Sequence, residues 1–213
     1  MRKFSRTADR FVFPGPVGDV EVMTSWPKEL KSNTVAIICH PHPLFQGTMD
    51  NKVVTTLYKS FDQLGMPTLR FNFRGVGQSE GQHGGGEDEQ HDVVALIDWL
   101  GQTLPEFKIV LAGFSFGSYV AAAVASRHSV AGLVSVAPPV HHYPFTTLAK
   151  ITSPWLVLMG DEDEIVPVQA VRDFVANGPN LSYQEMPGVS HFFHGQLVPL
   201  REAVCAWGAR QDW

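Results

Sequence analysis

Short apolar runs rich in β-branched residues alternate along this chain with longer segments of helical periodicity. The runs predict eight strands, at residues 10–14, 19–26, 34–40, 67–73, 108–113, 132–137, 154–160 and 181–188. Helical patterns cover residues 51–65, 89–104, 118–128, 168–178 and 195–210. The first two runs, separated by Gly-Pro-Val-Gly, predict a hairpin. The alternation that follows predicts an α/β fold, with helices on both faces of a mostly parallel central sheet of about eight strands.

Length and composition narrow the class of protein. A chain of 213 residues, 44% hydrophobic and 17% charged, is typical of one globular domain, here residues 1–213. The net charge of −5 and the lack of a basic run give no indication of a nucleic-acid partner. Cys39 and Cys205 both lie in apolar segments. This placement favours buried free thiols in a reducing compartment over a disulfide framework. With no signal-like segment and no membrane-spanning run, we expect a cytoplasmic protein; the oligomeric state is not indicated.

A serine stands at the junction of a predicted strand and a predicted helix, in Gly113-Phe114-Ser115-Phe116-Gly117. This G-x-S-x-G pattern between a strand and a helix is typical of a nucleophile elbow, a strained turn that exposes the hydroxyl above the sheet. The alternative is a serine that only caps the helix. The two interpretations differ in whether an acid and a base follow later in the chain.

An acidic cluster supplies the first partner. In "GDEDEIVP" four carboxylates follow the strand at 154–160. We expect Asp163 to be the acid, because the third residue past the strand's glycine should turn back toward the sheet edge, with Asp161 as the alternative. Glu162 and Glu164 are expected to face solvent. Some of these acids could instead cap the helix that follows Pro167.

A histidine loop supplies the second partner. His191 in "EMPGVSHFFHG" follows a strand and a glycine turn and precedes the last helix, where a base that activates a serine is expected. His194 is the competing candidate. We favour His191 because it comes first after the turn, and because Phe192 and Phe193 can pack behind its ring.

These three segments, in this order, resemble the catalytic segments of the α/β-hydrolase superfamily. The resemblance extends from about residue 34 to the C-terminus. "FNFRGVGQSEG" resembles a turn found after the fourth strand of many members. "CHPHPLFQGTMDNKVV" resembles compact bacterial hydrolases akin to dienelactone hydrolases and X-prolyl-peptidase-like proteins. The resemblance implies a serine hydrolase that works through a Ser-Asp-His triad and an acyl-enzyme, without a cofactor.

Acyl transfer also needs N–H donors for the developing oxyanion. One is expected from the backbone of Phe116, the residue after the serine. The other should come from residues 40–45, where Pro41 and Pro43 have no N–H to give. Alignment with the family pattern indicates Leu44, with Phe45 second.

The connection between the strands at 132–137 and 154–160 is short. It leaves space for little or no cap domain, so we expect a shallow site. The side chains expected to line it are apolar or aromatic, which suits an ester with a small or medium acyl group: Phe45, Val140, His141, Tyr143, Phe145 and Phe192.

The remaining polar residues are expected to be structural. His40 and His42 could form a zinc pair, completed by His141, His142 and His194, but bracing of the oxyanion loop is favoured, and no metal is expected. Arg74 and Ser79 are interpreted as turn residues, with the guanidinium on loop carbonyls. Asp50 and Asn51 are expected to cap the first helix.

Three functions fit these residues. The favoured one is hydrolysis of small-molecule carboxylic esters. The same triad would serve a thioesterase, an amidase or peptidase, or an acyltransferase, because these reactions share a tetrahedral intermediate. A scaffold that binds without catalysis is the third, and the complete set of Ser115, Asp163 and His191 argues against it.

Overall fold

The computed structural model describes residues 2–148, 150–176, 178 and 181–213, so residue 177 of the expected helix at 168–178 lies outside the described residues. Its eight strands are β1 (Asp9–Gly15), β2 (Gly18–Ser25), β3 (Thr34–Cys39), β4 (Thr68–Phe71), β5 (Lys108–Phe114), β6 (Gly132–Val136), β7 (Trp155–Gly160) and β8 (Leu181–Met186). The helices are α1 (Lys52–Gln63), α2 (Asp88–Thr103), α3 (Phe116–Ala125), α4 (Val168–Ala176) and α5 (Leu197–Gly208).

All eight strands form one sheet in the order β1-β2-β4-β3-β5-β6-β7-β8. β1 and β2 form the expected antiparallel hairpin, and β2 is also antiparallel to β4. The pairs from β4 through β3 to β8 are parallel. The predicted mostly parallel sheet is therefore confirmed.

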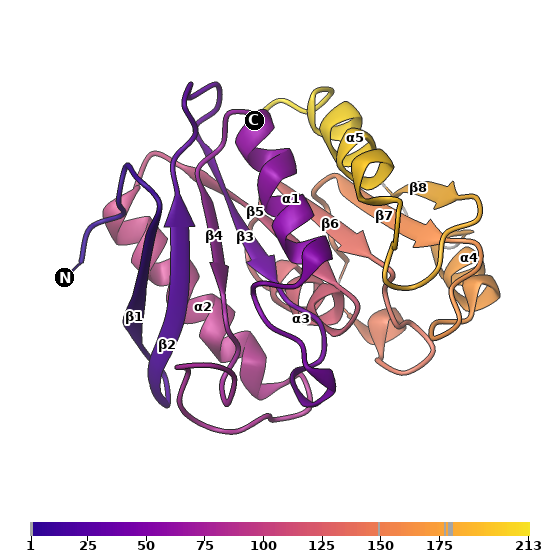
Figure 1. The fold of residues 1–213 in the computed structure, drawn as a ribbon, viewed down its shortest axis with the longest axis horizontal. Coiled ribbons are helices and arrows are strands. Elements are labelled where there is room, and N and C mark those ends of the chain that lie inside the picture. The colour runs from indigo at the N-terminus through magenta and orange to yellow at the C-terminus, as the bar shows by residue number, and fades with distance from the viewer. Residues whose placement is uncertain (1, 149, 177, 179–180) are drawn as a thin grey trace.

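Helices cover both faces of this sheet. Figure 1 shows α1 and α5 together in front of it and α2 and α3 behind it. All residues of β3, β6 and β7 are buried, and so are the last five of β5. This explains why these strands are continuous apolar runs rather than alternating ones.

The parallel strands all end at the same edge of the sheet. The loops that carry the candidate residues leave from this edge: 40–45 after β3, Ser115 after β5, 137–143 after β6, Asp163 after β7 and His191 after β8. Ligand sites of open α/β sheets lie outside the carboxyl ends of the strands. The topology thus gathers segments up to 151 residues apart, from His40 to His191, at one place.

The connection from β6 to β7 carries no cap domain. Its described part contains a single 3-10 turn, Phe145–Thr147, between the two strands. The expectation of a compact fold without a lid is confirmed. Across the described residues, every helix is too short or too polar to cross a membrane.

Candidate active site

The strand-to-helix turn holds Ser115 in a conformation that residues with a side chain rarely adopt. Its φ is 51° and its ψ is −120°, a region that costs of order 1–3 kcal/mol. The Ser115 N–H donates to Val136 O of β6 at 2.8 Å, and Ser115 O accepts from Ser118 Oγ at 2.6 Å. The Ser115 side chain makes no capping hydrogen bond to the helix. The turn therefore fixes the position of the Ser115 hydroxyl, and the hydroxyl does not serve as a helix cap.

Two glycines let this turn close. A Cβ on Gly113 would overlap the backbone of Gly117, and a Cβ on Gly117 would overlap the carbonyls of Cys39 and His40 at the end of β3. Because backbone atoms cannot swing aside as a side chain can, the close approach of α3 to β5 and β3 requires glycine at both positions.

We expect Gly117→Ala to lower the free energy of unfolding by about 2 kcal/mol or more, because α3 must move away from β3 to admit the methyl group. Gly101→Ala is the matched control. Gly101 lies in α2 with nothing within 4 Å of its added Cβ, and the change should raise stability by roughly 0.5–1 kcal/mol. Urea denaturation of both variants measures the difference. Equal effects would contradict the tight approach.

Ser115, His191 and Asp163 form one hydrogen-bonded line. His191 Nε2 lies 3.2 Å from Ser115 Oγ, and His191 Nδ1 lies 2.8 Å from Asp163 Oδ2. The His191 and Asp163 side chains are only 3% and 0% exposed. A carboxylate can only accept, so Nδ1 carries the proton and Nε2 is left to accept from the serine hydroxyl. This is the arrangement in which imidazole can act as a general base.

The acidic loop separates its carboxylates by role. Asp163 Oδ1 accepts the N–H groups of Ile165 and Val166 at 2.9 and 2.7 Å, which leaves Oδ2 for His191. Asp161 turns away and accepts from Gly188 N–H at 2.6 Å. Glu164 is exposed, as expected, and its carboxylate also accepts the His191 backbone N–H at 3.1 Å. It anchors the histidine loop to the acidic loop.

Aromatic rings fix the His191 imidazole from two sides. Phe114, the fully buried last residue of β5, lies 5.1 Å from it between ring centroids, and Phe192 meets it edge-on at 5.1 Å. Phe193 packs on Phe114 at 6.4 Å instead. His194 is exposed and stacks on Phe192. The contact with Phe114 was missed from the sequence, where that residue looked like ordinary packing.

The expected oxyanion donors are unequally available. The N–H of Phe116, the first residue of α3, is among the helix N–H groups that have no partner within the helix. The Leu44 N–H instead donates to His42 Nδ1 at 3.2 Å, and the Phe45 N–H to His42 O at 3.1 Å. In the described part of the chain no acceptor engages the backbone N–H of His42. The sequence signal for it was its place as the first residue with an N–H after Pro41.

His40 braces this loop from below. Its Nε2 accepts the Phe73 N–H at 2.9 Å, and its Nδ1 lies 2.6 Å from Pro41 O, so Nδ1 carries the proton. Burial lowers the pKa of His40 to about 4, and the ring is neutral at neutral pH. Both nitrogens are occupied, so His40 is unsuited to bind a metal. Nowhere in the described ranges do three or more His, Cys, Asp or Glu side chains gather as metal ligands would.

Beside the loop of residues 40–45 lies a buried carboxylate whose role the sequence does not reveal. Glu89 is 0% exposed and accepts from Gly84 N–H, Gly86 N–H and His83 Nδ1 at 2.7–2.9 Å. Burial opposes its ionisation, but the backbone N–H groups outweigh burial and lower the pKa of Glu89. The His83 ring in turn packs against His42 at 4.6 Å.

The turn after β4 is held differently from expectation. Arg74 does not bond loop carbonyls; its Nη2 pairs with the fully buried Asp92 carboxylate at 2.8 Å. Ser79 does serve the turn, by donating to Asn72 O at 2.6 Å. Asn51 caps α1 through Val53 N–H, whereas Asp50 instead pairs with Arg70.

The expected substrate-lining residues do not all share one environment. Phe45 and Phe192 are 81% and 42% exposed, and His141 is also exposed. Tyr143 is half-buried, 5.6 Å from the Phe116 ring and stacked on Tyr119 at 4.6 Å. Burial raises the pKa of Tyr143 to about 12, so its hydroxyl stays neutral. Val140 instead lines a separate cavity, which is bordered by α4 and the β6–β7 connection.

Comparison with known proteins gives consistent results. A family model described as alpha/beta hydrolase fold matches residues 46–149. An alpha-beta serine hydrolase homologue from Coxiella burnetii is 47% identical, with 96% of this chain and 99% of that chain covered and a TM-score of 0.92. A Xanthomonas campestris protein described as an α/β serine hydrolase without lid is 37% identical, with 99% and 97% covered and a TM-score of 0.94. An uncharacterised protein of Rickettsia prowazekii is 36% identical over 204 residues, 90% of this chain and 85% of its own length. The chain therefore belongs to the α/β-hydrolase family.

Proposed function

We propose that this protein is a serine hydrolase that cleaves carboxylic esters with Ser115 as nucleophile, His191 as base and Asp163 as the acid that orients the base. The observation that carries the proposal is the hydrogen-bonded line from Ser115 Oγ through the His191 ring to Asp163. A serine hydroxyl attacks poorly unless a base takes its proton, and this line supplies such a base in the correct tautomer.

The reaction proceeds in two halves. Ser115 Oγ attacks the ester carbonyl carbon while His191 Nε2 takes the hydroxyl proton. The tetrahedral intermediate expels the alcohol, which leaves with that proton, and an acyl-enzyme remains. Water then attacks the acyl carbon, gives one proton to His191, and the acid departs as the proton returns to Ser115. Asp163 stabilises the imidazolium that forms in each half.

The oxyanion of each intermediate would be met by two backbone donors. The Phe116 N–H is one. For the second we assign the His42 N–H in preference to Leu44 and Phe45, because both of those N–H groups already donate within the loop. The neutral His40 ring, locked between Pro41 O and Phe73 N–H, keeps this loop in place. Loss of one such donor costs about 3 kcal/mol of barrier lowering.

The rim of the site fits apolar groups of small or medium size. Exposed Phe45 and Phe192 stand on opposite loops, and Tyr143 lies against Phe116. Ester cleavage is favoured over amide cleavage because an ester's alcohol is expelled readily, whereas an amide nitrogen must be protonated before its bond to carbon can break. Kinetics with p-nitrophenyl esters and with aminoacyl-anilides separate an esterase from a peptidase. Measurable turnover of anilides alone would reassign the substrate class.

A fluorophosphonate probe tests the proposal directly. We expect the folded protein to be labelled at Ser115, with peptide mapping showing the phosphonate on that residue, because only an activated serine reacts at a useful rate. Ser118→Ala is the control for an unactivated neighbour and should still be labelled. Failure of the folded wild-type protein to react would overturn the assignment of Ser115 as a nucleophile.

A further inference from the structure

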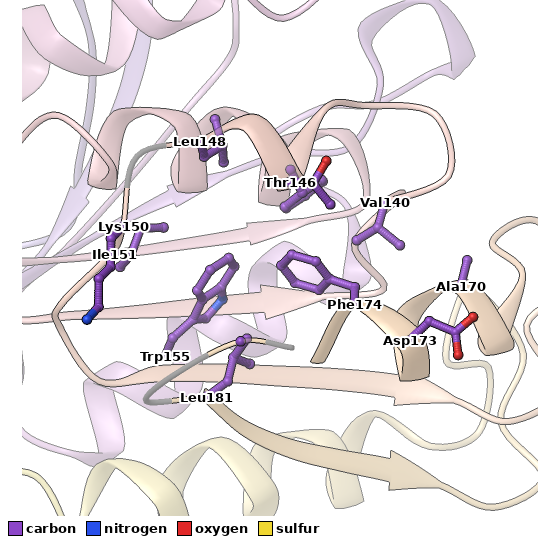
Figure 2. Close-up of a pocket in the computed structure, with 12 residues that line it drawn as sticks. Val140, Thr146, Leu148, Lys150, Ile151, Trp155, Ala170, Asp173, Phe174 and Leu181 are labelled. Carbon is purple, nitrogen blue, oxygen red and sulfur yellow. The ribbon is translucent and has the colours of Figure 1, made fainter. Parts of the chain in front are cut away.

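A cavity of about 610 Å³ lies behind α4, apart from the residues that hold the triad. Figure 2 shows side chains from the β6–β7 connection, from α4 and from the first residues of β7 and β8 around it. This volume is within the range of sites for small molecules. Apolar residues dominate its lining, among them Val140, Phe145, Trp155 and Phe174, and the polar residues Thr146, Lys150 and Asp173 also border it.

Among the residues that the structure describes, no helix covers the sheet between α3 and α4, which leaves room for the cavity. The described part of the connection from β6 to β7 contributes the turn Phe145–Thr147 there. Phe145 bridges the gap by packing on Tyr119 of α3 at 5.5 Å and on Phe174 of α4 at 5.6 Å. At this side of the cavity α3 and α4 are therefore connected through the Phe145 ring rather than by direct helix–helix packing.

The floor of the cavity is apolar with its polar atoms satisfied. Trp155 packs on Phe174 at 5.7 Å, and its Nε1 donates to Ser135 Oγ at 3.0 Å. The indole N–H of Trp155 therefore needs no hydrogen-bond acceptor on a bound ligand. A ligand in contact with this floor gains from burial of apolar surface alone.

The cavity extends along the strands, from the first residues of β7 and β8 toward the carboxyl edge of the sheet. Trp155 and Leu181 begin β7 and β8 and mark the far end, while Val140 follows β6 and marks the other (Figure 2). β6 ends at Val136, whose carbonyl accepts the Ser115 N–H. The Val140 end thus lies at the carboxyl edge of the sheet, from which the loops of Ser115, Asp163 and His191 also leave.

We propose that this cavity receives the acyl chain of the substrate, entered past Val140, so that the preferred substrates are esters of medium-length unbranched fatty acids. The inference rests on the proposed function. The acyl group stays on Ser115 through both halves of the reaction, whereas the alcohol leaves after the first. A mostly apolar cavity that reaches the carboxyl edge of the sheet at Val140 therefore suits the group that remains.

The test compares p-nitrophenyl octanoate with p-nitrophenyl acetate. In the wild-type protein, kcat/KM for the octanoate should exceed that for the acetate by about tenfold or more, since each buried methylene favours binding. Ala170→Trp places an indole into the cavity from α4 and should reduce this ratio to about one, with Ala170→Leu intermediate. Ala206→Trp, the same change at an exposed position of α5, should keep the wild-type ratio.

Each ratio is taken within one preparation, so a partial loss of folded protein cancels. A wild-type ratio near one, or a ratio unchanged in Ala170→Trp, overturns the acyl-chain cavity while acetate hydrolysis leaves the proposed function standing. If neither ester is cleaved, both proposals are overturned.

Discussion

Replacing Ser115 by alanine is expected to lower kcat for p-nitrophenyl acetate by about 10⁴-fold or more, because no other hydroxyl is hydrogen-bonded to His191 Nε2 among the described residues. Thermal unfolding of this variant should match the wild type. Alanine keeps the Cβ, so the unfavourable φ of 51° persists. The assay is initial-rate hydrolysis at saturating ester, corrected for the spontaneous reaction.

Ser115→Gly makes this test sharper. We expect its kcat to be as low as that of Ser115→Ala. Glycine, however, has no side chain, and residue 115 lies in a backbone region that favours glycine. We expect its free energy of unfolding to exceed that of Ser115→Ala by about 1 kcal/mol. A glycine variant that is inactive but more stable than Ser115→Ala would show that a side chain at position 115 costs stability and that the hydroxyl is nevertheless needed for activity. Residual Ser115→Ala turnover near wild type would refute the nucleophile.

The second large effect concerns the acid. Asp163→Asn should lower kcat by about 10⁴-fold with little change in KM. The asparagine oxygen can still accept from Ile165 and Val166, so its NH₂ group faces His191 Nδ1. The imidazole must then carry its proton on Nε2, where it can no longer accept from Ser115.

Asp161→Asn is the matched control on the same loop. Asp161 accepts only the Gly188 N–H, which an amide oxygen also accepts, and it makes no contact with His191 that the structure describes. Its kcat should stay within about threefold of wild type, since an exposed polar exchange perturbs little. The reverse pattern, loss in Asp161→Asn and activity in Asp163→Asn, would reassign the acid.

The fold could be predicted from the sequence because the two patterns that indicate it, apolar runs and a glycine-flanked turn, are local in the chain. Continuous apolar runs such as residues 34–40 and 154–160 are typical of strands buried on both faces. Glycines at 113 and 117 indicate a tight turn between a strand and a helix. The order of serine, acid and histidine then places all three at one sheet edge, whatever the details of packing.

What could not be predicted depends on contacts between distant segments. Arg74 finds Asp92 rather than loop carbonyls because α2 passes behind the turn. Glu89 lies in a first helical turn, where dipole complementarity is the ordinary explanation, yet the Gly84–Gly86 backbone folds over it. The loop of residues 40–45 forms a 3-10 turn in which the Leu44 and Phe45 N–H groups already donate to His42. No residue-by-residue pattern encodes these partners.

The strand order has a consequence for how activity is lost. Ser115 follows β5, which is bonded on both sides by β3 and β6, whereas His191 follows β8, the edge strand bonded only to β7. Edge elements open locally at a lower free energy than central ones. The proposed base can thus detach while the turn that holds Ser115 remains folded. If His191 is the base, activity is lost before the protein unfolds globally.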